Sequence, residues 1–293
     1  MKKRKMKKII EALRNFKTRK FDINLEKAII KEVDIQIKNA NSNENFANHL
    51  WKLKTLLLAQ NYYLQFVELI SMKKYYDSWL VLEKCENSIN ILNRHIDKEL
   101  AKKYYFKFLR FQVSKWQKLY PYNLFASPEF IHKKVKCSIC NKYLTPRNNC
   151  QHLVGNLYSG EICYHIIEDI ELIGVAMVKN PVMKSNVIDP HGENKNFTGI
   201  DMILSILPTP FQYWDINYTK TFIPNAHIIH KTPNMFCPCQ SGLSYLLCCK
   251  GKRGCLIPHY QIIPYTQNIE NELEMNLDIK LKISNYLYEL RNS

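Results

Sequence analysis

Glycine and proline are missing from the first 120 residues, where the earliest proline is Pro121 and the earliest glycine is Gly155. Both residues break helices, so their absence favours long helices in this part of the chain. Long apolar runs are also lacking: the uncharged run from Leu172 to Val178 is far shorter than the roughly 20 residues that cross a bilayer. Because Glu11 and other charges interrupt the segment after the basic start, we predict neither a secretory signal nor a membrane span.

Cysteine is present but confined to one part of the chain. Nine of the ten cysteines follow residue 136, and only Cys85 stands apart. Clustered cysteines without a secretory signal are better interpreted as reduced metal ligands than as disulfides, which predicts a cytoplasmic protein. A hydrophobic content of 46% allows packed cores, and 293 residues suffice for about two domains.

The apolar spacing of the glycine-free region agrees with helices. Apolar side chains recur every three or four residues from Phe46 to Ile70 and from Leu100 to Phe111. This period places them on one helical face. We predict helices near residues 23–39, 44–73, 77–95 and 97–119, packed as antiparallel hairpins.

Periodicity changes after Phe125, where glycine, proline and cysteine appear together. Apolar residues alternate between Ile162 and Met177, which predicts a small β-hairpin or meander after the first cysteine cluster. The prolines of residues 190–232 predict loops with short elements. Strict alternation from Leu273 to Ile283 predicts a half-buried strand, although a helix also suits that composition.

The first cluster has the form Cys137-x2-Cys140-x9-Cys150-x-His152. Two thiols two residues apart form a tight knuckle that faces one ion, and a second pair nine residues later completes a tetrahedron of the kind that holds zinc. Cys163 is a fifth candidate, which replaces His152 in an alternative ligand set.

The second cluster places Cys237, Cys239, Cys248 and Cys249 within 13 residues, in the form C-x-C-x8-C-C. Four thiolates in one short loop can close a tetrahedral metal shell. Cys255 and His259 lie just beyond and are alternative ligands, although we interpret them as packing neighbours.

The surroundings of the second cluster resemble the SEC-C motif, the metal-binding tail of the bacterial SecA translocation motor. The pattern C-P-C-x-S-G-x-x-Y-x-x-C-C is met over about residues 233–260 by the four cysteines together with Pro238, Ser241, Gly242 and Tyr245. The resemblance implies a bacterial protein with a bound ion of zinc type, iron also being accepted by thiolates. It also implies docking to an export chaperone or a ribosome. The usual lysines around Tyr245 are replaced by Leu243, Leu246 and Leu247, which puts a basic contact surface in doubt.

Catalytic motifs are lacking, since the chain has no phosphate-binding loop, nucleophile elbow or H-E-x-x-H pair. Both clusters supply four ligands and leave no open position for water, so structural metal is the favoured interpretation. The alternative is a metal-dependent HNH-like nuclease, or a defence or toxin effector, in which His152 activates water. Gln151 stands where such a nuclease would carry an acidic residue or histidine, so we expect no enzyme.

The first 20 residues carry ten lysines and arginines against Glu11 alone, which is nine of the sixteen net positive charges. Ile9, Leu13 and Phe16 give this segment a helical apolar stripe. A cationic amphipathic helix of this kind can dock on nucleic acid or a ribosome through phosphate contacts.

These observations predict an α+β protein, with an all-helical N-terminal domain followed by two small zinc-stabilised modules with short strands. Its predicted function is non-catalytic: it binds two zinc ions and docks a partner through the SEC-C-like module and the basic arm. The predicted domains are a basic amphipathic arm (1–20), a helical domain (21–124), a zinc-knuckle β module (125–190), a loop-rich connector (191–232), and a SEC-C-like module with a C-terminal strand or helix (233–293).

Overall fold

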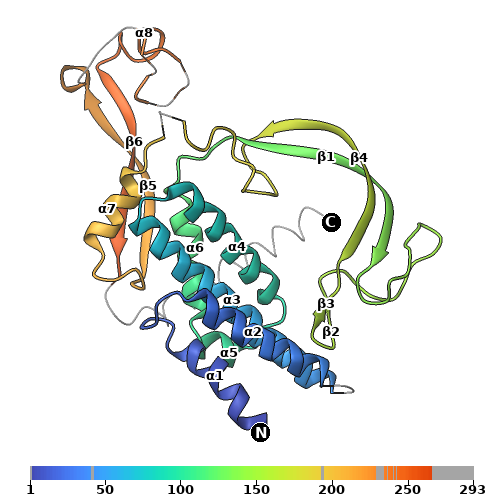
Figure 1. The fold of residues 1–293 in the computed structure, drawn as a ribbon. Coiled ribbons are helices and arrows are strands. Elements are labelled where there is room, and N and C mark those ends of the chain that lie inside the picture. Colours follow the sequence, from blue (N-terminus) through green and yellow to red (C-terminus); the bar gives the residue numbers. More distant parts are fainter. Residues whose placement is uncertain are drawn as a thin grey trace, which may run out of the picture. The chain divides into compact units, whose positions relative to one another are not determined.

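The α+β fold class is confirmed: helices form the N-terminal part of the chain, and small antiparallel sheets with the cysteine clusters follow (Figure 1). The chain folds as two compact units, Met1–Phe211 and Gln212–Ser293. In the described part, no helix has both the length and the apolar character needed to cross a membrane. The strand or helix predicted for 273–283 lies outside the described residues. The structure is a computed structural model that describes residues 2–40, 43–192, 195–228, 234–235, 237–239, 241 and 243–265.

Helix α3 is the centre of the first unit, and the other N-terminal helices pack around it. Fourteen of its side chains are buried, from Ala47 to Ile70. Asn43 caps its start by accepting a hydrogen bond from the Phe46 N–H at 3.0 Å. The six helices are α1 (Lys2–Arg14), α2 (Ile23–Lys38), α3 (Glu44–Ser71), α4 (Tyr75–Asn93), α5 (Lys98–Lys103) and α6 (Phe106–Gln117).

The prediction of one helix over 97–119 is wrong, because the chain breaks between α5 and α6. Tyr105 adopts the left-handed conformation, with φ of 61°. The buried Gln60 amide donates to the Tyr104 carbonyl at 2.9 Å, so the break leaves that carbonyl satisfied. A tertiary hydrogen bond therefore stabilises a break that no glycine or proline in the sequence indicates.

The basic segment at the start of the chain forms α1, whose apolar face belongs to the helical core. Ile9, Leu13 and Phe16 are all buried. The Phe16 ring meets the ring of Phe211 edge-on, with centroids 5.1 Å apart. Helix α7 (Thr198–Ile206) buries Ile200 and Ile203.

Two long strands form a ribbon that leaves the helices and returns to them at its far end. Strand β1 (Phe125–Cys137) pairs antiparallel with β4 (His165–Val178), and β2 (Leu157–Tyr158) pairs with β3 (Glu161–Ile162) (Figure 1). The hairpin or meander predicted after the cysteine cluster is present there only as the short β2–β3 pair, whereas β4 pairs with β1, which precedes the cluster. The Gly160 N–H donates to the Asn48 side chain at 2.7 Å, so the β2–β3 turn rests on the start of α3.

The second unit is built on one long antiparallel pair. Strand β5 (Trp214–Pro224) pairs with β6 (Gly254–Pro264) along its whole length, so residues 190–232 are more regular than predicted. Between the strands lie the 3-10 helix η1 (Asn225–His227) and α8 (Tyr245–Cys248). A small, sulfur-rich core cluster of this unit consists of Ile228, Cys237, Tyr245, Cys249 and Cys255, and Trp214 and Ile216 on β5 are also buried.

Candidate metal centres

The first cluster begins where β1 ends, at a knuckle made by Cys137 and Cys140. The Cys137 N–H donates to the Lys142 carbonyl at 3.0 Å, and its carbonyl accepts from the Asn141 N–H at 2.9 Å. Asn141 takes the left-handed conformation, with φ of 57°, which turns the chain back. The Ile139 N–H points at the Cys137 sulfur at 3.4 Å. The knuckle thus holds its sulfur with backbone groups.

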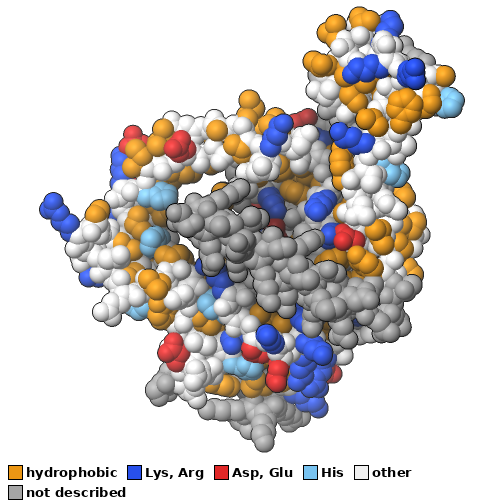
Figure 2. Space-filling view, turned by 180° about the vertical axis from the view of Figure 1, so that it is seen from behind, with side chains coloured by type: hydrophobic (Ala, Val, Ile, Leu, Met, Phe, Trp, Pro, Cys, Tyr) orange, Lys and Arg blue, Asp and Glu red, His pale blue; other side chains and the backbone are white. Residues whose placement is uncertain are grey.

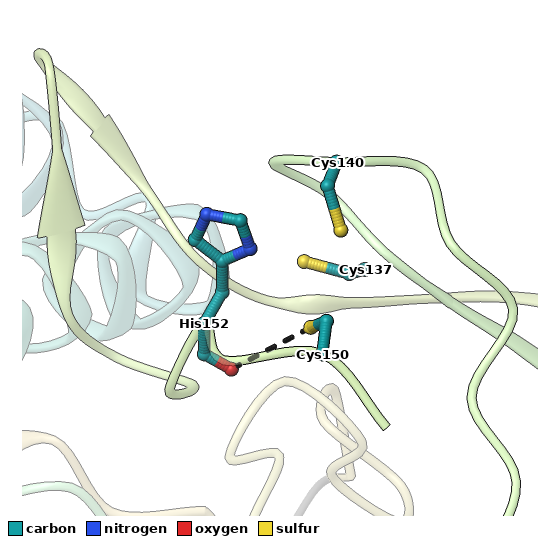
Figure 3. Close-up of side chains that lie close together, drawn as sticks. All are labelled: Cys137, Cys140, Cys150 and His152. Carbon is teal, nitrogen blue, oxygen red and sulfur yellow. Dashed lines mark hydrogen bonds between the residues drawn. The ribbon is translucent and has the colours of Figure 1, made fainter. Parts of the chain in front are cut away.

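Cys150 and His152 complete the predicted set. The ligand atoms of these two residues and of Cys137 and Cys140 all lie within 4.8 Å of one another. Figure 3 shows the imidazole of His152 beside the sulfurs, with one ring nitrogen turned toward them. The ring packs edge-on against Tyr158, with centroids 4.8 Å apart. Its Nδ1 is buried without a hydrogen-bond partner among the described residues, which is the condition of a nitrogen that serves as a ligand.

Cys163 lies beside the same set, directly after β3. Its sulfur is 3.8 Å from the Cys137 sulfur, and both side chains are buried. Ligands at the corners of a tetrahedron with metal–sulfur bonds of about 2.3 Å lie about 3.8 Å apart. The Cys163 sulfur thus lies at ligand distance from one sulfur of the set, whereas His152 belongs to the four residues whose ligand atoms all lie within 4.8 Å of one another. The alternative drawn from the sequence stays open.

The electrostatics of the first cluster distinguish its thiols. Burial opposes ionisation of Cys137, but N–H groups of Cys140 and Ile139 stabilise the thiolate and lower its pKa to about 6. Burial, with the nearby Cys137 sulfur, raises the pKa of Cys163 to about 11. A divalent cation favours the deprotonated form of every thiol that it contacts, so metal binding by this cluster releases protons.

The second cluster is formed by the loop that leads into α8 and by the end of that helix. The ligand atoms of Cys237, Cys239, Cys248 and Cys249 all lie within 4.8 Å of one another. Neighbouring sulfurs are 3.3 Å apart for Cys237 and Cys239, 3.4 Å for Cys239 and Cys248, and 3.7 Å for Cys248 and Cys249. These separations approach the edge of a tetrahedral sulfur site.

Two side chains of the motif outside the cysteines support this loop. The Ser241 hydroxyl donates to the Cys248 sulfur at 3.2 Å. A hydrogen bond from Ser241, followed by contacts with neighbouring thiols, lowers the pKa of Cys239 to about 6. Tyr245 is buried in the core of the unit, and its N–H donates to the Met235 carbonyl at 2.8 Å.

The two alternative ligands of the second site have different surroundings. Cys255 is buried in the same small core as Cys237 and Cys249. His259 is exposed on β6, where it pairs with Thr219. Cys255 therefore lies near the sulfurs, as a packing neighbour would, and His259 belongs to the strand pair.

Sequence spacing alone did not identify Asn225, which ties the end of the second site to the sheet. Its amide donates to the carbonyls of Cys249, Lys250 and Lys252 at 3.1, 3.3 and 2.5 Å. Asn225 precedes the cluster by more than ten residues and carries no ligand pattern. Only the return of β6 beside η1 brings it to the cluster.

Both donor sets suit the same chemistry. Sets of four thiolates, or of three thiolates and one imidazole, are those of structural zinc sites, and they leave no coordination position for a substrate or water. No family model, curated protein or solved structure matches the chain. The two cysteine clusters, which can each hold a metal ion, are therefore the basis for the function.

Proposed function

We propose that the chain is a non-catalytic zinc protein whose two clusters stabilise small modules, and that it docks on a phosphate-rich partner, an RNA or a ribosome. The observation that supports it most is the convergence of two complete four-ligand sets, each with its ligand atoms within 4.8 Å of one another. Zinc is the favoured ion, because thiolate and imidazole ligands at these separations suit a tetrahedral borderline-soft cation.

The buried Nδ1 of His152 supports a structural site over the nuclease. A nuclease histidine must reach a water molecule that attacks phosphate, whereas this imidazole lies against Tyr158 and beside the three sulfurs. If His152 is the fourth ligand, the nitrogen that holds the metal has no lone pair left to accept a proton. We therefore propose the structural site and not the nuclease.

We also propose that the second unit contains a SEC-C-like module. Its support is that residues of the motif other than cysteines have structural roles: Ser241 donates to a ligand sulfur, and Tyr245 packs in the core. Leu243, Leu246 and Leu247 are exposed or half-exposed around the helix that carries Cys248. An apolar contact with a protein partner, such as an export chaperone, suits this surface better than a phosphate contact.

The phosphate-binding surface that we propose lies on α1. Lys7, Lys8, Arg14 and Lys17 are exposed, and none of them joins an ion pair within the described residues. The Lys17 ammonium also lies 5.0 Å from the centre of the Tyr105 ring. Unpaired surface cations of this kind release counterions when they bind phosphates.

The metal sites are tested by plasma mass spectrometry on the full chain purified without oxygen. We expect two zinc ions in the wild type and one after Cys248→Ala. Either His152→Ala or Cys163→Ala will lose the other ion, which identifies the fourth ligand. Cys85→Ala is the matched control and keeps both ions, because Cys85 is buried in α4, outside both clusters. Wild-type protein without bound metal would overturn the zinc assignment.

Docking is tested by the fluorescence anisotropy of a labelled single-stranded RNA over a range of salt. Changing Lys7, Lys8 and Lys17 together to serine should weaken binding and lower the slope of log K against log salt by about 2. The matched control changes Lys27, Lys31 and Lys84, three exposed lysines on α2 and α4, in the same way. Equal losses in both triple variants would show that α1 has no special role.

A further inference from the structure

The β1–β4 ribbon exposes several large apolar side chains to water, which does not stabilise a monomer. Leu172, Val175 and Met177 on β4 are 57%, 61% and 72% exposed, and Ile131 on β1 is 48% exposed. Figure 2 shows hydrophobic side chains along this part of the surface. A two-stranded ribbon is only marginally stable in water, and three or more strands are the usual minimum for a stable sheet. The ribbon thus has the composition of a strand pair that belongs to a larger sheet.

The two edges of the ribbon are not equivalent. The β1 edge is protected: it begins with the Ala126 N–H donating to the Asn186 carbonyl at 2.8 Å, continues with Pro128, and ends among lysines. Prolines and lysines are the residues that prevent further strand pairing at a sheet edge. The β4 edge from Leu172 to Val178 has neither a charge nor a proline. If the ribbon is extended by another strand, that strand pairs with β4.

Proline also shows which backbone groups of β4 face the open edge. Pro128 is opposite Val175 in the register, and because proline has no N–H the two residues cannot form a hydrogen-bonded pair. In the antiparallel pattern the N–H and C=O of Val175 therefore point away from β1. The next such pair is Ala126 and Met177, which agrees with the Ala126 N–H being used by Asn186. The backbone N–H and C=O groups of both Val175 and Met177 thus face the edge of β4 that lies away from β1.

We propose that this edge is a homodimer interface, in which β4 of one chain pairs antiparallel with β4 of a second copy. A two-fold axis at Ala176 brings Val175 of each copy opposite Met177 of the other, so the outward groups of both residues bond across the axis. The result is a four-stranded sheet in the order β1–β4–β4–β1. A β-bulge interrupts the β4 register between Leu172 and Gly174, so the regular part of this ladder is Gly174–Val178.

Charge and shape favour a second copy in this orientation. The uncharged segment Leu172–Val178 is preceded by Glu171 and followed by Lys179. Antiparallel pairing brings Lys179 of the second copy near the Glu171 end of the first, whereas parallel pairing would bring like charges together. A side chain added at Gly174 would meet no atom within 4 Å, so nothing of the described chain covers that face. Gly174 has no side chain and Ala176 has only a small one, which leaves room for the close approach of another strand.

The test is the mass of the full zinc-loaded chain by light scattering across a wide range of concentration. We expect the wild type to approach twice the 34.8 kDa of one chain as concentration rises. Val175→Pro should abolish the dimer, because it removes an outward N–H without breaking a bond to β1. Val175→Thr is the matched control: it keeps the N–H and the branched side chain and should retain the dimer.

A second variant tests the same interface without depending on how Val175→Pro folds. In Ala176→Cys, the new thiol lies next to its counterpart across the axis, where Cα atoms are about 4.5 Å apart and a disulfide can form. We expect an intermolecular 176–176 disulfide in peptide mass spectra after air oxidation, and none at position 127 for Ser127→Cys on β1. A wild type that stays monomeric, or a dimer that survives Val175→Pro, would overturn the proposal.

Discussion

The helical core is stabilised by one kind of interaction and the two cysteine modules by another, although they belong to one chain. Helix α3 alone buries fourteen side chains. Aromatic rings pack closely there: the ring centroids of Phe66 and Trp116 are 5.3 Å apart. In the second unit, the buried cluster around the cysteines has five residues among those described, three of which are cysteines. Apolar burial stabilises the first region, whereas the second has too little apolar surface to fold by burial alone. Metal binding supplies the missing free energy in small domains of this kind.

Removing metal should separate the two regions most clearly. We expect a chelator under reducing conditions to abolish the amide protection of residues 137–163 and 237–257, because a structural zinc ion contributes on the order of 10 kcal/mol to folding. Residues 44–93 of the helical core should keep their protection. Hydrogen exchange followed by mass spectrometry measures both regions in one sample. Cysteine segments that stay protected after verified metal loss would remove the distinction.

The reverse experiment removes apolar packing from the helical core. Phe66 is fully buried against Tyr63 and Trp116, so Phe66→Ala should lower the free energy of unfolding by about 3–5 kcal/mol while the metal content stays at the wild-type level. Urea unfolding monitored by circular dichroism measures the loss. Phe130→Ala on the exposed ribbon is the matched control and should cost under about 1 kcal/mol. Equal losses would mean that the ribbon belongs to the same core.

Gly160 lies at one of the contacts between the ribbon and the helices of the first unit. Its φ is 83°, and a Cβ there would lie 2.6 Å from Ile37 Cγ2 and 3.1 Å from the Ala47 carbonyl oxygen. Gly160→Ala should therefore cost about 1–3 kcal/mol and detach the β2–β3 turn from α3. Faster hydrogen exchange of the turn, with unchanged exchange in α4, is the expected result. Gly251→Ala is the control, since no atom lies within 4 Å of its added carbon.

The smallest expected effect is on the pH dependence of stability. It depends on Cys85, the one cysteine inside the helical core. Burial raises the pKa of its thiol, whose hydrogen bond reaches the Ala59 carbonyl at 3.1 Å. Since the folded pKa lies above the unfolded pKa, this contribution is fully present below the unfolded value and is lost as the pH rises above it. Stability should fall by about 1.4 kcal/mol per pH unit above roughly pH 8.5.

Cys85→Ala should make that alkaline decline shallower by the same amount. Urea midpoints for both proteins between neutral and alkaline pH measure the difference. Identical slopes would show that the thiol does not ionise on unfolding in this range.

Helices and ligand sets were predictable from the sequence because they depend on local spacing. The apolar period from Phe46 to Ile70 predicted α3 nearly to its ends. The four ligands of each cluster lie within 16 and 13 residues of one another, so short turns suffice to bring them together. Which of His152 and Cys163 is the fourth ligand was not predictable, because the fold brings His152 beside all three sulfurs and Cys163 beside the Cys137 sulfur.

Features that depend on distant residues were missed. The strand partner of β4 is β1, which precedes it by almost thirty residues and carries a charged, weakly alternating sequence. The break at Tyr105 depends on Gln60, and the end of α8 depends on Asn225. None of these partners is indicated by a local pattern.

By itself, the sequence determined the helical character of the first part, the four candidate ligands of the second cluster and three of the candidate ligands of the first, since periodicity and short spacing are local properties. Only the tertiary structure decided that α1 packs its apolar face into the core, that the β2–β3 turn rests on α3, and that no strand of the described residues pairs with the outer edge of β4. Those outcomes depend on which groups meet after the chain has folded. Buried hydrogen bonds and strand pairing select among contacts that are far apart in sequence and equally compatible with the local patterns.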